Sequence, residues 1–410
     1  MAAFDQPLIP EIKNLIEFCK NHKKIYLVAP PQASSEYYTK GIHDKELLAT
    51  DCPESNCGNM IQKFLKFCHI KCEIFSVETL PKNKSMRIFR KSIGYIVPYS
   101  SDLTNIISNL IKLKCTELFL ISEYNTRTIN YKMTPRKVEN FWLEVNLADH
   151  CDLNCQCCDH FSPIASKTFL DPSEYRRDIH RLSQLTNGKI GIMKLQGGEP
   201  LLNENINDIV RATREEFPES TIWLFTAGIR LLKWETNPAG NLWQTLKECN
   251  VQIELTRYPI PLDYDKILEK AEEYGVKIRT NNNVGDRDFQ GVKFSVKHPF
   301  DLDGKQELYR FISCYQFNEV PVLRHGKIYP CPMTAYIEHF NNHFKQNLQL
   351  SEEDAIDLYK VNTFEEIAEF CTHRVPFCRY CAVQCRHGLP WARSNKSIDE
   401  YTLTTNEVSE

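Results

Sequence analysis

The sequence FWLEVNLADHCDLNCQCCDH, residues 141–160, joins an apolar strand pattern to a short loop that carries four cysteines. Strand and amphipathic helix patterns alternate after it, which is typical of a parallel β/α barrel or part of one. We predict strands at Phe141–Leu147, Ile190–Leu195, Thr221–Phe225, Gln252–Leu255 and Lys277–Thr280, and helices near 172–186, 203–216, 241–248 and 264–274. The first strand is therefore expected to deliver the cysteine loop to the end of the barrel where active sites are built.

The loop contains the spacing CxxxCxxC, formed by Cys151, Cys155 and Cys158. Three thiolates on one short loop can hold three corners of a cubane iron–sulfur cluster and leave one iron open for an outside ligand. A structural zinc site would need a fourth protein ligand, which Asp159 or His160 could supply. The triplet alone therefore leaves iron–sulfur and zinc chemistry both open.

A second motif ends the next predicted strand. Gly197-Gly198-Glu199-Pro200 follows the apolar run at 190–195. The two glycines let the backbone approach a ligand closely, and Glu199 offers a carboxylate to an ammonium group. A lone GGEP would be read as a turn, but its place on the strand after the cysteine loop favours a shared binding site.

These two motifs, in this order on successive strands, resemble those of the radical S-adenosylmethionine (SAM) enzymes. The resemblance covers about residues 140–300 and implies a [4Fe–4S] cluster at the cysteine triplet, with SAM bound to its open iron. It implies that Gly197, Gly198, Glu199 and Pro200 bind the SAM amine. An electron from the cluster would then cleave SAM to a 5′-deoxyadenosyl radical.

Two softer matches extend the predicted SAM site. Thr226, in Phe225-Thr226-Ala227-Gly228, stands where the family has a Thr-Asn-Gly turn, and Arg257 follows the fourth strand, where the family often contacts the SAM carboxylate. A surface salt bridge is an equally good explanation of Arg257. The sequence departs from the family at Cys157, where an aromatic residue normally contacts adenine, and Phe161 is the candidate substitute.

A second set of cysteines lies near the C-terminus. Cys314, a predicted hairpin with a His325-Gly326 turn, Cys331 and a later CxxC resemble the auxiliary-cluster extension of many radical SAM enzymes, the SPASM or twitch domain. The number of cysteines available in this region favours the shorter, twitch-like form with one auxiliary [4Fe–4S] cluster. We predict its ligands to be Cys314, Cys331, Cys378 and Cys381, with Cys385 in reserve, Cys371 as buried filler and a Cys₄ zinc site as the alternative.

Residues 1–136 alternate helix and strand patterns and predict a small α/β domain of unknown role, in which Asn125–Lys137 is expected to be a linker. The fold class is thus α/β: this N-terminal domain, a partial parallel TIM-like barrel, and a cysteine-rich auxiliary-cluster domain. The predicted divisions are 1–136, 137–300, 301–395 and a frayed polar tail at 396–410.

Composition restricts the function further. The 410-residue chain has a formal net charge of −3, which argues against a nucleic-acid partner. It has no apolar run long enough to span a membrane, and its start, MAAFDQPLIPEIK, does not resemble a secretory signal, so we expect a cytoplasmic protein. Seventeen cysteines in such a chain favour metal ligation over disulfides.

We therefore predict a radical SAM oxidoreductase or isomerase. Its substrate is expected to be sugar-like or another small molecule that is oxidised or epimerised, because residues 1–136 do not resemble the winged helix of many peptide-modifying relatives. A peptide maturase is the alternative within the family, and a non-catalytic metal-binding or redox-sensing scaffold is the alternative outside it. The resemblance also implies a low-potential electron donor such as flavodoxin or ferredoxin.

Overall fold

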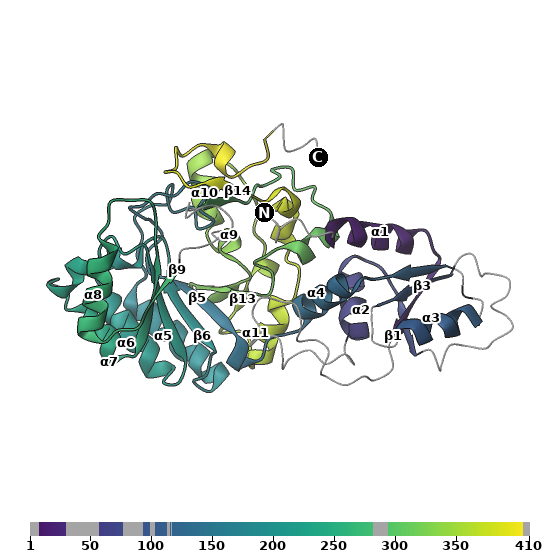
Figure 1. Cartoon of the computed structure of the whole chain (residues 1–410), viewed down its shortest axis with the longest axis horizontal. Helices are drawn as coiled ribbons and strands as arrows, with labels where there is room; N and C mark the ends of the chain where they lie inside the picture. The colour runs from purple at the N-terminus through teal and green to yellow at the C-terminus, as the bar shows by residue number, and fades with distance from the viewer. Residues whose placement is uncertain are drawn as a thin grey trace.

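The structure, a computed structural model, describes residues 8–29, 57–76, 93–98, 103–112, 115, 117–281 and 294–404. An N-terminal sheet with its helices lies at one end of the long axis and a partial barrel at the other, with the C-terminal elements between and above them (Figure 1). The predicted α/β class and parallel partial barrel are confirmed.

The N-terminal sheet has the strand order β2-β1-β3-β4, and all three pairings are parallel. Alternate side chains of β1 point to opposite faces of this sheet. On one face Ile25 and Leu27 pack with α1 and α2. On the other face Tyr26 and Val28 pack with α3. Both faces of the sheet are therefore covered. The elements are α1 (Leu8–Lys20), β1 (Lys24–Ala29), α2 (Cys57–Phe67), β2 (Glu73–Ser76), β3 (Ile93–Val97), α3 (Leu103–Lys112) and β4 (Leu118–Leu120).

The predicted linker at Asn125–Lys137 is wrong over most of its length, because α4 (Glu123–Met133) occupies it. The hydroxyl of Ser122 accepts a hydrogen bond from the backbone N–H of Asn125 at 3.3 Å and caps the helix. Ile129 and Met133, one helical turn apart, are fully buried in the N-terminal core. The polar residues between them conceal this narrow apolar stripe in the sequence.

The barrel strands run side by side and parallel from β5 to β9 within an eight-stranded sheet. Leu143 and Val145 of β5 pack into the core beneath the helices, and the residues between them point the other way. Every predicted strand overlaps an observed one. The barrel elements are β5 (Trp142–Asn146), α5 (Pro172–Thr186), β6 (Ile192–Gln196), α6 (Ile206–Glu216), β7 (Thr221–Thr226), α7 (Leu242–Glu248), β8 (Val251–Thr256), α8 (Tyr264–Tyr274) and β9 (Ile278–Asn281).

The C-terminal elements extend this sheet on the β5 side. The predicted hairpin is confirmed, and β11 pairs parallel with β5, so the order continues as β13-β12-β11-β5. His325 and Gly326 both have positive φ in its turn. These elements are β10 (Phe294–Lys297), β11 (Val322–Arg324), β12 (Lys327–Tyr329), α9 (Pro332–Ala335), α10 (Ile337–Phe344), β13 (Ile356–Asp357), α11 (Phe364–Cys371) and β14 (His387–Pro390).

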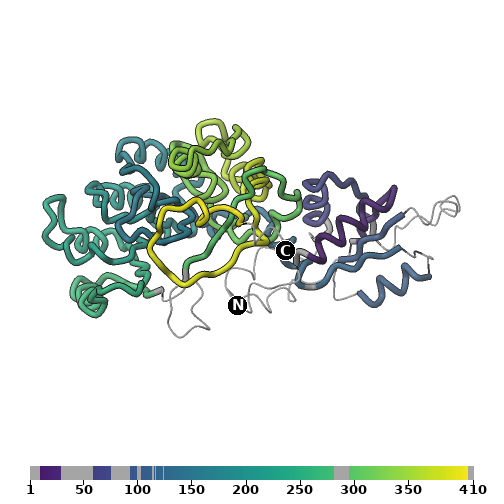
Figure 2. The backbone as a smooth tube through the Cα atoms, turned by 90° about the horizontal axis from the view of Figure 1, so that it is seen from above, coloured from purple at the N-terminus to yellow at the C-terminus, as the bar shows by residue number. Residues whose placement is uncertain are grey.

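The segment at 396–404 is packed rather than frayed. The backbone N–H of Phe300 donates to the carbonyl of Tyr401 at 2.8 Å, and Tyr401 is 2% exposed. Its ring lies 5.3 Å from that of Phe161. Figure 2 shows the end of the chain, in yellow, lying across the barrel part of the molecule. The rest of the predicted tail, 405–410, lies outside the described residues.

Replacing Met133 with Ala should lower the free energy of unfolding by about 2–5 kcal/mol, because a fully buried side chain leaves a cavity. The control is Tyr124→Ala on the same helix, where the side chain is 44% exposed and the cost should stay within about 0.5 kcal/mol. Chemical denaturation followed by circular dichroism measures both. Equal costs would contradict the placement of α4 in the core.

Candidate iron–sulfur site

The cysteine loop leaves the carboxyl end of β5 and holds the three motif thiols near one another. Burial raises the pKa of the Cys151 thiol well above its ordinary value, and the negative charges of Glu199, Cys155 and Cys158 raise it further. The structure therefore brings together the cysteine triplet and the acidic residue of the GGEP motif. Such a group of half-buried thiols is stabilised by a bound cation or cluster.

The GGEP turn lies directly against the backbone of the cysteine loop. The N–H of Gly198 donates to the carbonyl of Ala148 at 2.7 Å, and the N–H of Glu199 donates to the carbonyl of His150 at 3.1 Å. Gly197 has a φ of +136°, and a Cβ on Gly198 would overlap the carbonyl of His150. The glycines are thus required for contact between two strand ends, and their close approach to a ligand stays a prediction.

The Glu199 carboxylate is 1% exposed and accepts three hydrogen bonds. The donors are the hydroxyl of Thr226 at 2.7 Å and the backbone N–H groups of Ala227 and Leu201, both at 3.2 Å. Burial raises the pKa of Glu199 to about 7, although these hydrogen bonds oppose the shift. Thr226 therefore serves the site by orienting Glu199, and a cation beside this carboxylate would favour its charged form.

Two residues near the cysteines belong to no motif that the sequence reveals. Tyr258 follows β8, and the pKa of its phenol is raised far above its ordinary value by burial and then by Cys155, Cys158 and Cys151. Arg230, after β7, donates to the carboxylate of Asp152 in the cysteine loop at 2.8 Å. Arg257 is exposed and lies over the ring of Tyr264, 4.8 Å from its centroid. Its contact with SAM stays a prediction.

Phe161 does not fill the place of the missing aromatic residue. Its side chain is fully buried and packs with Phe300, Phe340 and Tyr401 in the C-terminal aromatic core. The expectation that Phe161 contacts adenine is therefore wrong, since its ring is committed to the core.

The four C-terminal cysteines predicted as a set are also brought together. The pKa of the Cys381 thiol is raised well above its ordinary value, first by burial and then by Cys378, Cys331 and Cys314. The 3-10 helix η8 (Leu308–Ser313) leads into the first of these cysteines, and η10 (Pro376–Tyr380) contains Cys378. Cys371 is 2% exposed within the barrel core, as predicted for a filler residue.

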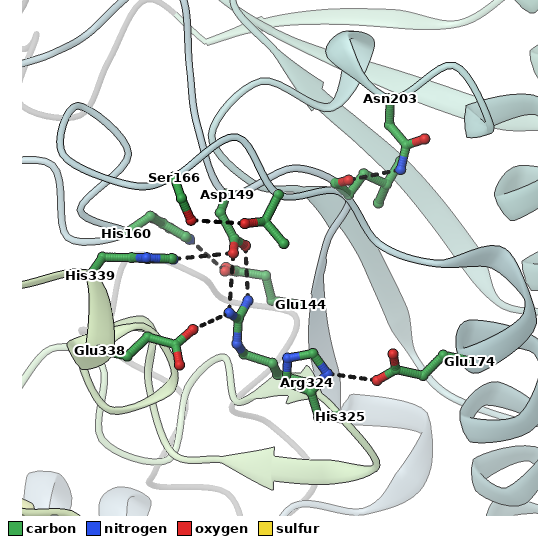
Figure 3. A network of polar contacts seen from close by, with 12 residues as sticks. Glu144, Asp149, His160, Ser166, Glu174, Asn203, Arg324, His325, Glu338 and His339 are labelled. Carbon is green, nitrogen blue, oxygen red and sulfur yellow. Dashed lines mark hydrogen bonds and ion pairs between the residues drawn. The ribbon is translucent and has the colours of Figure 1, made fainter. Parts of the chain in front are cut away.

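Charged side chains join the cysteine loop to the C-terminal hairpin (Figure 3). Asp149 accepts two hydrogen bonds from Arg324, at 2.8 and 3.1 Å, and a third from His339 at 3.1 Å. Although burial acts to raise it, these hydrogen bonds lower the pKa of Asp149 to about 2. The start of the loop is thus fixed to β11 and α10.

A second network lies inside the partial barrel. Nε2 of His160 lies 2.6 Å from the Glu144 carboxylate, and its Nδ1 lies 2.8 Å from Asp159. The ammonium group of Lys194 is 3.5 Å from the other oxygen of Glu144 and lies over the ring of Phe225. Both ring nitrogens of His160 thus have carboxylate partners, although ligand atoms of Cys158, Asp159 and His160 also lie within 4.8 Å of one another and could hold a metal ion.

Two further polar groups inside the barrel lack partners among the described residues. They are the side-chain amide of Asn146, a residue only 7% exposed, and the buried indole N–H of Trp223. Glu254, 1% exposed on β8, is paired with Arg279 of β9 at 2.6 Å. Because buried polar groups are normally hydrogen-bonded, this interior is suited to a polar ligand.

Comparisons with known proteins give a family match and several similar structures. The family described as a 4Fe-4S single cluster domain matches residues 144–256. Among solved structures the chain is similar to BtrN in complex with AdoMet and 2-DOIA, at 15% identity over 61% of this chain and 94% of that chain, with a TM-score of 0.37. It is also similar to Streptococcus suis SuiB bound to precursor peptide SuiA, at 11% identity over 74% and 88%, with a TM-score of 0.30.

The matched region contains the cysteine triplet and the GGEP turn, which meet at the ends of β5 and β6. Over these residues the chain is similar to a 4Fe-4S single cluster domain. No helix in the described part of the chain is both long and apolar enough to cross a membrane.

Replacing Glu199 with Gln should weaken SAM binding about tenfold or more, because the buried site loses a charge-assisted hydrogen bond worth about 1.5–3 kcal/mol. The matched control is the exposed Glu204→Gln, just beyond the motif. Anaerobic calorimetry on the cluster-loaded protein measures both affinities. An unchanged affinity in Glu199→Gln would remove Glu199 from the SAM site.

Proposed function

We propose that this chain is a radical SAM enzyme that binds a [4Fe–4S] cluster and SAM. It abstracts a hydrogen atom from a small, polar, sugar-like substrate, which it oxidises or epimerises with the help of one auxiliary [4Fe–4S] cluster. The observation that carries the proposal is the presence of two separate groups of neighbouring thiols, three at the end of β5 and four among the C-terminal elements. Reductive cleavage of SAM at the first cluster supplies the 5′-deoxyadenosyl radical.

In the first group we assign Cys151, Cys155 and Cys158 as cluster ligands. Thiolates are the donors that iron–sulfur clusters require, and three of them leave one iron open. The zinc alternative needs a fourth protein donor, for which Asp159 and His160 lie within reach of Cys158. Both are hydrogen-bonded, to each other and to Glu144 and Tyr315, so zinc would have to displace these partners. We assign Gly197–Pro200 to the SAM amine, with Glu199 as the acceptor.

In the second group we assign Cys314, Cys331, Cys378 and Cys381 to the auxiliary cluster. Four thiolates fill all its protein ligand positions, so this cluster has no open iron. A Cys₄ zinc site uses the same donors and is distinguished by metal analysis. Cys385 stays the reserve ligand.

We assign the substrate to the barrel interior. The free groups of Asn146 and Trp223, together with Lys194, offer hydrogen-bond donors from three strands. An apolar ligand would leave these groups unpaired, at a cost of about 1–3 kcal/mol each, whereas hydroxyl or amino groups would satisfy them. This favours a sugar-like molecule over an apolar one.

We assign residues 1–136 a supporting role. Tyr309, Phe311 and Ile312 of η8 are buried in the same core as α1, α2 and α4. The segment that ends at Cys314 is therefore held by the N-terminal core. Its parallel sheet differs from a winged helix, which favours a small substrate over a peptide. A flavodoxin or ferredoxin would supply the electron.

Two cysteine variants separate the roles of the two groups. The wild-type chain should bind about eight irons after anaerobic reconstitution, and Cys155→Ala and Cys378→Ala should each bind about four. With SAM and dithionite, Cys155→Ala should form no 5′-deoxyadenosine, because it lacks a triplet ligand. Cys378→Ala should still form it, because its triplet is intact.

Iron counting and chromatography of the nucleoside products measure these outcomes. Loss of 5′-deoxyadenosine in Cys378→Ala with a loaded first cluster would contradict the separation of roles. A full iron load in both variants would contradict both ligand assignments.

A further inference from the structure

The C-terminal segment, residues 387–404, reaches back to the cysteine loop. It begins as β14, which pairs antiparallel with β10, so that Gly388 lies opposite Val296. Beyond β14 the chain continues along the loop itself. The N–H of Gln156 donates to the carbonyl of Ala392 at 3.0 Å. The side chain of Gln156 also donates to the carbonyl of Pro390 at 2.6 Å.

A second set of contacts fixes the turn within the motif. The N–H of Ser394 donates to the carbonyl of Asn154 at 2.7 Å. The Glu400 carboxylate accepts from the N–H of Cys157 at 3.3 Å and from the N–H of Asn395 at 2.8 Å. Cys157 has a φ of +56°, a conformation that non-glycine residues adopt rarely, and this contact supports it.

The most direct contact is made by Trp391. Its indole N–H donates to Sγ of Cys155 at 3.1 Å. The hydroxyl of Tyr258 also hydrogen-bonds Cys155, and its ring lies 5.7 Å from that of Trp391. An aromatic pair from two distant parts of the chain therefore surrounds one predicted cluster ligand.

A hydrogen bond to a ligating sulfur withdraws charge from it, and this stabilises the reduced, more negative state of the cluster. Removing the donor should therefore make the midpoint potential of that cluster more negative. A packing contact without a hydrogen bond would not produce this shift. The substitution Trp391→Phe keeps an aromatic ring but removes the N–H.

We propose that the C-terminal segment is part of the SAM-cluster site, in which Trp391 is a positioning residue whose indole N–H raises the reduction potential of the cluster through Cys155. This inference rests on the proposed function, because it takes Cys155 as a ligand of that cluster. It also gives a role to residues 387–404, which contain no cysteine.

The test compares Trp391→Phe with Trp142→Phe, a matched substitution at the first residue of β5, by redox titration of the reconstituted chain with electron paramagnetic resonance. We expect a more negative midpoint potential for the SAM cluster in Trp391→Phe only, with the auxiliary cluster unchanged and the iron content still about eight. An unchanged potential, or an equal shift in Trp142→Phe, would overturn the proposal.

A second measurement uses the wild-type chain and does not depend on how the variant folds. Protein labelled with ¹⁵N in the tryptophan indole should show a ¹⁵N coupling to the reduced SAM cluster in pulsed electron paramagnetic resonance. Absence of that coupling in fully loaded protein would overturn the proposal. If the chain binds no iron at all, the proposed function fails first, and this inference fails with it.

Discussion

The central constraint on this molecule is the backbone contact between the ends of two neighbouring parallel strands. Gly198 and Glu199 donate to the carbonyls of Ala148 and His150, and no side chain fits at position 198. This contact places a buried carboxylate beside three thiols. The two motifs therefore form one site because parallel strands end at the same edge of the sheet.

Other parts of the chain hold the cysteine loop in place around this contact. Arg324 and His339 fix Asp149 on one side, and the C-terminal segment binds Gln156 on another. The N-terminal core includes the residues of η8 that lead into Cys314. A site that takes part in electron transfer benefits from such support, because rigid surroundings keep ligand geometry and hydrogen bonds to sulfur constant.

Local sequence patterns predict much of the fold and of the candidate site. The barrel strands and helices follow from apolar periodicity, and the cysteine groups follow from spacing, because both are encoded in adjacent residues. The role of Trp391 beside Cys155 was not predictable, since it depends on contact between residues 236 positions apart. The sequence does not reveal helix α4, because its buried stripe is narrow. Nor do the motifs reveal that Phe161 belongs to the core, because motif spacing carries no information on packing.

The most direct test of the account is a Mössbauer spectrum of the anaerobically reconstituted, ⁵⁷Fe-labelled chain, recorded with and without SAM. If three thiolates leave one iron open at the end of β5, about one of about eight irons should change its isomer shift and quadrupole splitting when SAM is added. The remaining irons should keep their parameters. A spectrum that SAM leaves unchanged, or thiol groups that hold only zinc, would contradict the account.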